Sequence, residues 1–342
     1  SDSDGVHRAA IRAKALDTLR GMLPAATQSN VGIYGTGQAY ETLLLRMRAH
    51  PLAEVRSCAD EMLTELRKVI PAFLTRVDNP DRGGRWTQYL AERRDALTSL
   101  AERLEPAATA APAEVTLTEF DPDGEVKIVA AALYAVSDLP DDTLMHVARG
   151  MTAPEREAVL RAAIGERGNR RHRPGRAFER TAYRFDVLTD YGAFRDLQRH
   201  RLLTLDWQGF TPRHGFNIPD AIDDAGVLAE WREVVEGSGE LYESIAAAGW
   251  TAAASYAVAM AYRVRFYMHM NARQAMHVIE LRTAPQGHPA YRRVCQEMHR
   301  LIAEQAGHRA IAEAMRFADH SEVELERLGS ERALEQKRNR PT

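Results

Sequence analysis

Apolar residues recur every three or four positions over most of the chain, and in a few short stretches they alternate with polar residues. The first pattern predicts helices, and the second predicts half-buried strands. Helices are expected at 6–22, 38–48, 51–74, 86–104, 126–136, 143–149, 155–168, 220–235, 241–248, 252–260, 272–282, 288–305 and 308–319. Strands are expected at 30–34, 115–120, 178–188 and 262–270. Many helices around few strands predict an α+β fold, in which long helices flank a mixed or antiparallel sheet.

The strand expected at 262–270 leads directly into a helix with polar side chains at both ends. Asn271 lies between the two elements, and its side chain is well suited to cap the start of the helix. Arg273 lies in the first turn of this helix and Arg282 in its last turn. Two guanidiniums and one amide are therefore expected on a single short helix.

A change in composition divides the chain. Residues 105–114, EPAATAAPAE, have the proline and alanine content of a linker. We therefore expect a first domain over residues 1–104, a complete domain over residues 115–320, and a charged, frayed tail over residues 321–342.

The first domain resembles a later part of the chain. Leu45–Pro51, Cys58 and Glu61-Met62 parallel Ile279–Arg282, His288-Pro289, Cys295 and Glu297-Met298, with small gaps. An internal repeat explains this parallel, with a partial first copy that corresponds to the C-terminal half of the second. The first copy is degenerate, because Gly37 and Ala39 stand at the positions of Asn271 and Arg273.

The overall composition is that of a globular protein with room for two domains. The chain has 342 residues, 45% hydrophobic and 27% charged, with a formal net charge of −3 and a pI of about 6.5. This balance gives no overall attraction to nucleic acid or to an acidic membrane. No apolar run reaches the length that spans a bilayer.

The chain contains two cysteines, Cys58 and Cys295, which are too few for a disulfide framework or a thiolate metal site. Both lie in apolar helical patterns and are expected to be buried. The low cysteine content favours a reducing compartment, so we expect a cytoplasmic location. No cluster of residues has the spacing of metal ligands.

The segment 191–219 is the first candidate for an active site. A helical pattern leads into Arg199, His200 and Arg201, and a loop with Thr211 and Arg213 follows. Guanidinium groups are planar and permanently charged, and their donors match the oxygens of a phosphate. The alternative is that these cations only complement the dipole of a helix end.

Two motifs together resemble the flavin-dependent thymidylate synthases. Arg199-His200-Arg201 followed by Thr211-Pro-Arg213 is similar to the family's Arg-His-Arg and Ser-x-Arg-Tyr elements. In the family the serine lies eight positions past the last arginine, whereas Thr211 lies ten past Arg201. The second motif runs from Asn271-x-Arg273 to Leu281-Arg282, with His288 shortly after. The resemblance to the family covers about residues 115–310.

The resemblance implies a role for each matching residue. In the family, reduced FAD delivers a hydride to dUMP after a methylene transfer from methylenetetrahydrofolate, NADPH reduces the flavin, and no cysteine nucleophile takes part. The cofactor-binding residues would be Arg199, His200, Arg201, Asn271, Arg273 and His288. The nucleotide-binding residues would be Thr211 and Arg213, at the phosphate, and Arg282, at the uracil. Arg282 and Arg199 would be the catalytic residues.

Several positions depart from the family's pattern. Glu179 stands where a flavin-contacting histidine is usual, Asp196 where a glutamine is usual, and Ser255 near an expected phosphate-binding arginine. Two alternatives therefore remain open beside a synthase that makes dTMP. One is a related flavin enzyme that modifies another pyrimidine, and the other is a degenerate homologue that binds flavin or nucleotide, or acts as a scaffold.

The resemblance also implies a homo-oligomer, because the family builds its sites between the subunits of a homotetramer. A fused partial copy suggests a dimer that imitates this tetramer.

A second Arg-His-Arg, at 171–173, lies in the segment Asn169–Arg176. Pro174 and Gly175 predict a turn between a helix and a strand there.

Overall fold

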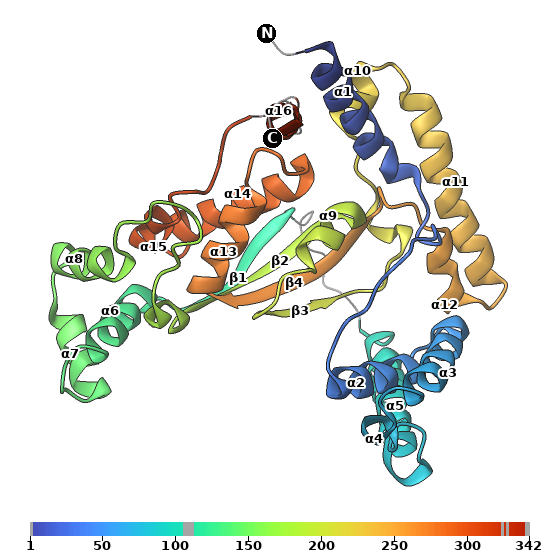
Figure 1. Ribbon diagram of the computed structural model, residues 1–342, viewed down its shortest axis with the longest axis horizontal. Helices are drawn as coiled ribbons and strands as arrows, with labels where there is room; N and C mark the ends of the chain where they lie inside the picture. Colours follow the sequence, from blue (N-terminus) through green and yellow to red (C-terminus); the bar gives the residue numbers. More distant parts are fainter. Residues whose placement is uncertain (1–2, 105–112, 323–324, 326–327, 339–342) are drawn as a thin grey trace. The chain divides into compact units, whose positions relative to one another are not determined.

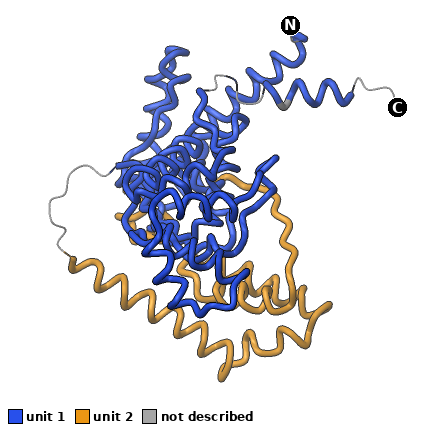
Figure 2. The backbone as a smooth tube through the Cα atoms, turned by 90° about the vertical axis from the view of Figure 1, so that its left-hand side faces the viewer, with its two compact units in different colours: residues 1–25, 112–242, 255–342 blue, residues 26–111, 243–254 orange. Residues whose placement is uncertain are grey.

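The computed structural model describes residues 3–104, 113–322, 325 and 328–338 (Figure 1). Most of the linker expected at 105–114 therefore lies outside the described residues. Contacts divide the chain into two compact units (Figure 2). The first comprises residues 1–25, 112–242 and 255–342, and the second comprises residues 26–111 and 243–254.

The first unit is built on an antiparallel sheet of four strands in the order β1-β2-β4-β3. These strands are β1 (Val115–Phe120), β2 (Ala182–Asp190), β3 (Thr204–Trp207) and β4 (Arg263–Asn271). The central pair, β2 and β4, is aligned along its whole length, from Ala182 opposite Asn271 to Asp190 opposite Arg263. The α+β fold with an antiparallel sheet is confirmed.

The sheet follows from the alternation in the sequence. In β4 the apolar residues Val264, Phe266 and Met268 are buried, while Arg263 and Arg265 are only partly covered. The buried side chains contact those of β2 and of the helices α13 (Ala272–Arg282) and α14 (Pro289–Glu304) in one hydrophobic core. In Figure 1, α13 and α14 lie along the sheet.

Further helices complete the first unit. They are α1 (Asp4–Leu19), α6 (Gly124–Tyr134), α7 (Asp141–Gly150), α8 (Ala153–Ile164), α9 (Tyr191–Leu197), α10 (Asp220–Asp224), α15 (Arg309–Ala314) and α16 (Leu328–Arg338). The helix α11 (Leu228–Ala247) begins in this unit. Part of the tail that we expected to be frayed forms α16, which contacts α1.

The second unit is helical. It contains α2 (Gly37–Arg48), α3 (Ala53–Arg67), α4 (Pro71–Leu74), α5 (Arg85–Ala101) and α12 (Thr251–Ala254). Its small core consists of Leu44, Ala59, Leu63, Leu74 and Val77.

Two predictions for the second unit are wrong. Residues 30–34 lie in neither a helix nor a strand of the described chain, because no neighbouring strand pairs with them. Cys58 is exposed, since α3 turns Ala59 and Leu63 inward instead. Cys295 is buried, as expected.

None of the helices in the described ranges is both long enough and apolar enough to cross a membrane.

Candidate functional site

Arg282 and His200, which are 82 residues apart in sequence, are in direct contact. The Nε of Arg282 donates a hydrogen bond to Nε2 of His200 at 2.8 Å. The same guanidinium donates to Oδ1 of Asp196 at 3.1 Å and to the backbone oxygen of Asp196 at 2.6 Å. It also lies 5.2 Å from the centre of the Tyr291 ring. The structure thus joins the two motifs that the sequence suggested.

Local structure explains this contact. Asn271 caps α13, because its side chain accepts a hydrogen bond from the backbone of Gln274 at 2.9 Å, and the helix then places Arg282 in its last turn. The helix α9 ends at Leu197, so Arg199 and His200 lie in the turn that follows it. The backbone of Leu202 then adopts a positive φ of 63°. This turn directs His200 toward the end of α13.

Asn271 and Arg273 lie at a small cavity near the start of α13. Arg173, Glu179, Leu202, Gln274 and His277 complete its lining, and its volume is about 20 Å³. Arg273 donates to the backbone oxygen of Pro174 at 2.9 Å and lies 3.6 Å from the carboxylate of Glu179. Glu179, which we expected at the position of a family histidine, lines the cavity and forms an ion pair with Arg273 there.

The other candidate residues take no part in the contact between Arg282 and His200, and two of them cap a turn or a helix. Arg199 and Arg201 are exposed, and Arg199 lies 3.8 Å from Asp196. Thr211 caps the short turn Pro212–His214, and its hydroxyl accepts a hydrogen bond from the backbone of the exposed Arg213. His288 caps α14 through a hydrogen bond from the backbone of Ala290. These contacts leave the predicted ligand-binding roles of the residues as predictions.

His277, which was not among the candidate residues from the sequence, belongs to the site. It lines the cavity, and its ring lies 5.8 Å from the ring of His200 in an edge-on arrangement. The sequence offers one signal, because His277 lies one helical turn after Arg273 and so shares its face of α13. Arg173, from the turn 169–176, also lines the cavity, and its sequence neighbours gave no indication of this.

His200 is held in its neutral form. Burial, the charge of Arg282 and the neighbouring His277 lower its pKa from 6.5 to about 4. The hydrogen bond agrees with this, because Nε2 can accept from a guanidinium only when it carries no proton.

We therefore expect the free energy of unfolding to fall as the pH is lowered from 6.5 to about 4. In this window the unfolded chain binds a proton at His200 that the folded protein excludes. His200→Gln, which keeps an acceptor for Arg282, should reduce this fall, as measured by urea unfolding at several pH values. The exposed His146→Gln is the control. An identical pH dependence for wild type and His200→Gln would contradict the prediction.

A model of the family described as thymidylate synthase complementing protein matches residues 116–307. The chain belongs to this family. The resemblance to flavin-dependent thymidylate synthases is thereby confirmed, and the thymidylate synthase complementing protein match includes α13 and the Arg-His-Arg turn.

Two proteins that are similar in sequence to this chain are both named UPF0159 proteins. One from Chlamydia muridarum is 36% identical over 331 residues, which are 96% of this chain and 62% of the relative. One from Thermoplasma acidophilum is 29% identical over 328 residues, 95% of this chain and 64% of the relative. The chain thus spans about three fifths of the length of these relatives.

Among solved structures, the chain is similar to a UMP/dUMP methylase, PolB from Streptomyces cacaoi, bound to 5-Br dUMP. The identity is 21% and the TM-score 0.47, over 60% of this chain and 96% of the methylase.

Proposed function

We propose that the protein methylates dUMP to dTMP reductively, with FAD as cofactor and methylenetetrahydrofolate and NADPH as co-substrates. The contact between Arg282 and His200 carries this proposal, because it unites the two motifs of a thymidylate synthase complementing protein at one place. Bound reduced flavin would supply the hydride. The residues of this chain would hold the ligands and stabilise charge on the pyrimidine ring as it develops.

Arg282 is the residue best placed for the pyrimidine. Its position is fixed by His200 and by the backbone oxygen of Asp196, so its guanidinium is oriented before a ligand arrives. A neutral His200 adds no second charge beside it. A preorganised cation of this kind stabilises a carbonyl oxygen that gains negative charge during the reaction.

Asn271 and Arg273 are the residues proposed to hold FAD. Amide and guanidinium donors at one cavity suit an anionic cofactor. The cavity of about 20 Å³ has room for roughly one water molecule, whereas sites for flavin-sized ligands measure roughly 300–1,000 Å³. Binding of FAD therefore requires that Leu202 and Arg173 move aside or that a second copy of the chain completes the site.

We propose that a second copy of the chain completes the site, in a homodimer. Light scattering that finds only monomer would argue against this homodimer.

Conversion of dUMP to dTMP tests the proposed reaction. The purified chain is incubated with FAD, NADPH, methylenetetrahydrofolate and dUMP, and dTMP is measured by chromatography. We expect dTMP to form only when all components are present. Absence of dTMP from protein that retains bound FAD would exclude the reaction but leave the flavin site in place.

One observation favours a second candidate, a family member that binds flavin or nucleotide without synthase activity. Asp196 stands where the family usually has a glutamine. Its carboxylate accepts a hydrogen bond from the guanidinium of Arg282. A negative charge at this place opposes an anionic ligand, while a glutamine would not.

Asp196→Asn is therefore expected to tighten the binding of dUMP, by roughly threefold to tenfold, since it removes one partly exposed charge. Isothermal titration with dUMP measures the change, and Asp206→Asn, at an exposed position of β3, is the control. Unchanged or weaker binding would mean that the Asp196 carboxylate does not compete with the nucleotide.

A further inference from the structure

Two buried arginines are attached to the last turn of α13. Among the arginines in the described ranges, only Arg167 and Arg292 are buried, at 2% and 5% exposure. Arg167 forms an ion pair with Glu280 of α13, which is 2% exposed. Arg292 donates from Nε to the backbone oxygen of Thr283, the C-cap residue of α13, at 2.9 Å. Both attachments lie within two residues of Arg282.

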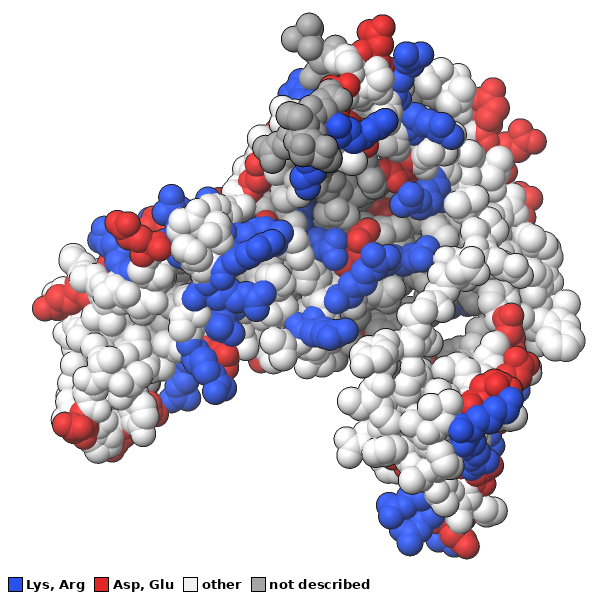
Figure 3. All heavy atoms as spheres, viewed as in Figure 1, with Lys and Arg blue, Asp and Glu red and all other residues white. Residues whose placement is uncertain are grey.

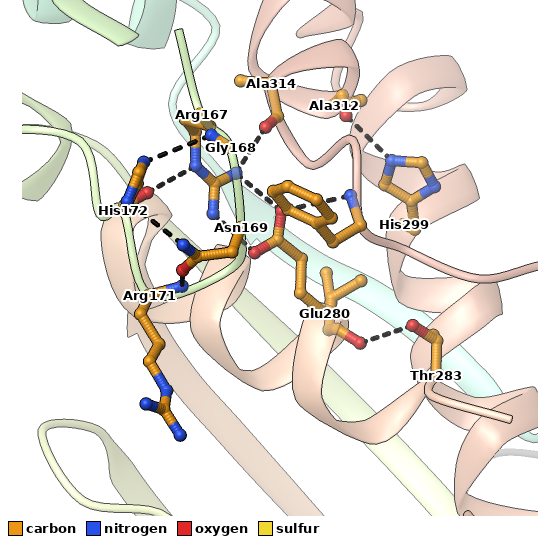
Figure 4. A network of polar contacts seen from close by, with 12 residues as sticks. Arg167, Gly168, Asn169, Arg171, His172, Glu280, Thr283, His299, Ala312 and Ala314 are labelled. Atoms are coloured by element: carbon orange, nitrogen blue, oxygen red, sulfur yellow. Dashed lines mark hydrogen bonds and ion pairs between the residues drawn. The ribbon is translucent and has the colours of Figure 1, made fainter. Parts of the chain in front are cut away.

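Arg167 joins α13 to two other segments (Figure 4). Its Nη1 and Nη2 donate to the two carboxylate oxygens of Glu280, at 2.6 and 2.7 Å. Nη1 also donates to the backbone oxygen of Ala314 at 2.7 Å, and Nε donates to that of His172 at 2.6 Å. Because donors on two edges of the planar guanidinium are engaged, its position between the three segments is fixed.

The second attachment ties the end of α13 to the segment 319–321. Nη2 of Arg292 donates to Oδ1 of Asp319 at 3.1 Å and to the backbone oxygen of Ser321 at 2.9 Å. The hydroxyl of Thr283, which is fully buried, accepts from the backbone of Asp319 at 2.9 Å. The last turn of α13 is therefore bonded to neighbouring segments at two places.

Helix geometry connects these attachments to Arg282. Glu280 and Arg282 face nearly opposite sides of α13, because two residues span about 200° of a helix. Side chains reach about 5–6 Å from a helix axis, so a rotation of about 10° moves a terminal group by about 1 Å. A displacement of about 1 Å in an active site can cost on the order of a hundredfold. The rotation of α13 therefore decides where the guanidinium of Arg282 lies.

The charges around α13 make an attachment of this kind necessary. Figure 3 shows basic side chains gathered on the face of the molecule around α13. Arg170, Arg171 and Arg173 are exposed on the loop that contains His172, and Arg273 lies in the first turn of α13. Like charges repel one another, so the loop and the helix would separate without an attraction between them. The pair of Arg167 with Glu280 supplies this attraction.

We infer that Arg167 and Arg292 are positioning residues, which fix the last turn of α13 so that the guanidinium of Arg282 meets a pyrimidine nucleotide in one orientation. The identity of this ligand rests on the proposed function. Apolar residues of similar volume in place of a buried ion pair often leave stability unchanged or raise it. A bidentate contact, in contrast, holds its partners in a single geometry.

Four variants of the full chain test the inference. The test variants are Arg167→Met/Glu280→Met, which leaves no uncompensated charge, and Arg292→Met. Arg167→Lys is the conservative variant, since it keeps the charge without the planar fork. The control is Tyr183→Phe, which removes a buried hydrogen bond of 2.8 Å to Nδ1 of His308, away from α13. Near-ultraviolet circular dichroism confirms that each variant is folded, and Arg167→Lys replaces the double variant if that variant is not.

We expect both test variants to bind dUMP roughly tenfold to a hundredfold more weakly than wild type in isothermal titration. Arg167→Lys should lie between wild type and the double variant, and Tyr183→Phe should bind as wild type does. Wild-type affinity in one test variant would remove that arginine from the inference, and wild-type affinity in both would overturn it. An equal loss in Tyr183→Phe would also overturn it, because the effect would then come from a looser core.

Nuclear magnetic resonance titration of His200 gives a second readout that needs no ligand. Burial, the charge of Arg282 and the neighbouring His277 lower the pKa of His200 to about 4. In the test variants Arg282 is displaced, so the pKa of His200 should rise toward 6.5, while in Tyr183→Phe it should stay near 4. His200→Gln assigns the signal. Weaker dUMP binding with an unchanged pKa of His200 would mean that Arg282 keeps its place, and it would overturn the inference.

The two readouts separate this role from the proposed function. If wild type binds no dUMP, the proposed function falls and the pKa of His200 decides alone. A rise of that pKa in the test variants then supports the positioning role, and an unchanged value overturns it. If wild type and both test variants bind dUMP equally well, the nucleotide site stands and the positioning role falls.

Discussion

Glu280→Gln is expected to lower the free energy of unfolding of the first unit by about 3–5 kcal/mol. The substitution leaves the guanidinium of Arg167 charged and buried without a counter-ion. Arg167 would keep its bonds to the backbone oxygens of His172 and Ala314, at 2.6 and 2.7 Å, and its position 5.2 Å from the Phe317 ring. These neutral partners do not replace a carboxylate in an interior of low dielectric. Chemical denaturation followed by circular dichroism measures the loss.

Two comparisons make this prediction specific. Arg167→Met/Glu280→Met removes both charges together and should cost less than Glu280→Gln, because no uncompensated charge remains. Glu157→Gln removes the partner of Arg161 in an exposed ion pair on α8 and should change stability by only about 0.5 kcal/mol. A loss below about 1 kcal/mol for Glu280→Gln would mean that the buried pair is not needed to hold Arg167.

Elements that depend on local pattern could be predicted from the sequence. The alternation of Val264, Phe266 and Met268 between basic residues indicated β4, and an asparagine before an apolar helical pattern indicated the cap at Asn271. Both depend on residues within one strand or one helical turn. The same local reasoning placed Arg282 at the end of α13.

Features that depend on distant partners could not be predicted in this way. Alternation at 30–34 suggested a strand, but a strand also needs a neighbour, and none pairs with it in the described chain. The short β3 was missed because the alternation in Thr204–Trp207 covers only four residues, and the strand is defined by its pairing with β4. Arg167 and Glu280 are 113 residues apart, so nothing near either residue indicates their pairing. The candidate site combines both cases, since α13 was predictable and its contacts with the loop and with His200 were not.

Arg282 and Arg48, which the expected internal repeat pairs with one another, allow a direct test of the site. Arg282 ends α13, whose start carries Asn271 and Arg273, and Arg48 ends α2, whose start carries Gly37 and Ala39. Arg48 forms an ion pair with Asp60 on α3, whereas Arg282 contacts His200 of the Arg-His-Arg motif. If the first copy is degenerate, as the sequence suggests, only Arg282 belongs to a nucleotide site.

Arg282→Ala is expected to weaken dUMP binding on the order of a hundredfold, because a lost guanidinium in a partly buried anion site costs a few kcal/mol. It also removes three hydrogen bonds to His200 and Asp196, so stability should fall by about 1–3 kcal/mol and binding must be measured below the melting temperature. Arg282→Lys separates the two effects, since it keeps the charge without the planar fork. Arg48→Ala should leave dUMP binding within about twofold of wild type, because the ion pair of Arg48 with Asp60 involves no residue proposed to bind the nucleotide. Equal losses of dUMP binding for Arg282→Ala and Arg48→Ala would mean that the first copy contributes to a nucleotide site, and the two copies would then have to be regarded as functional partners.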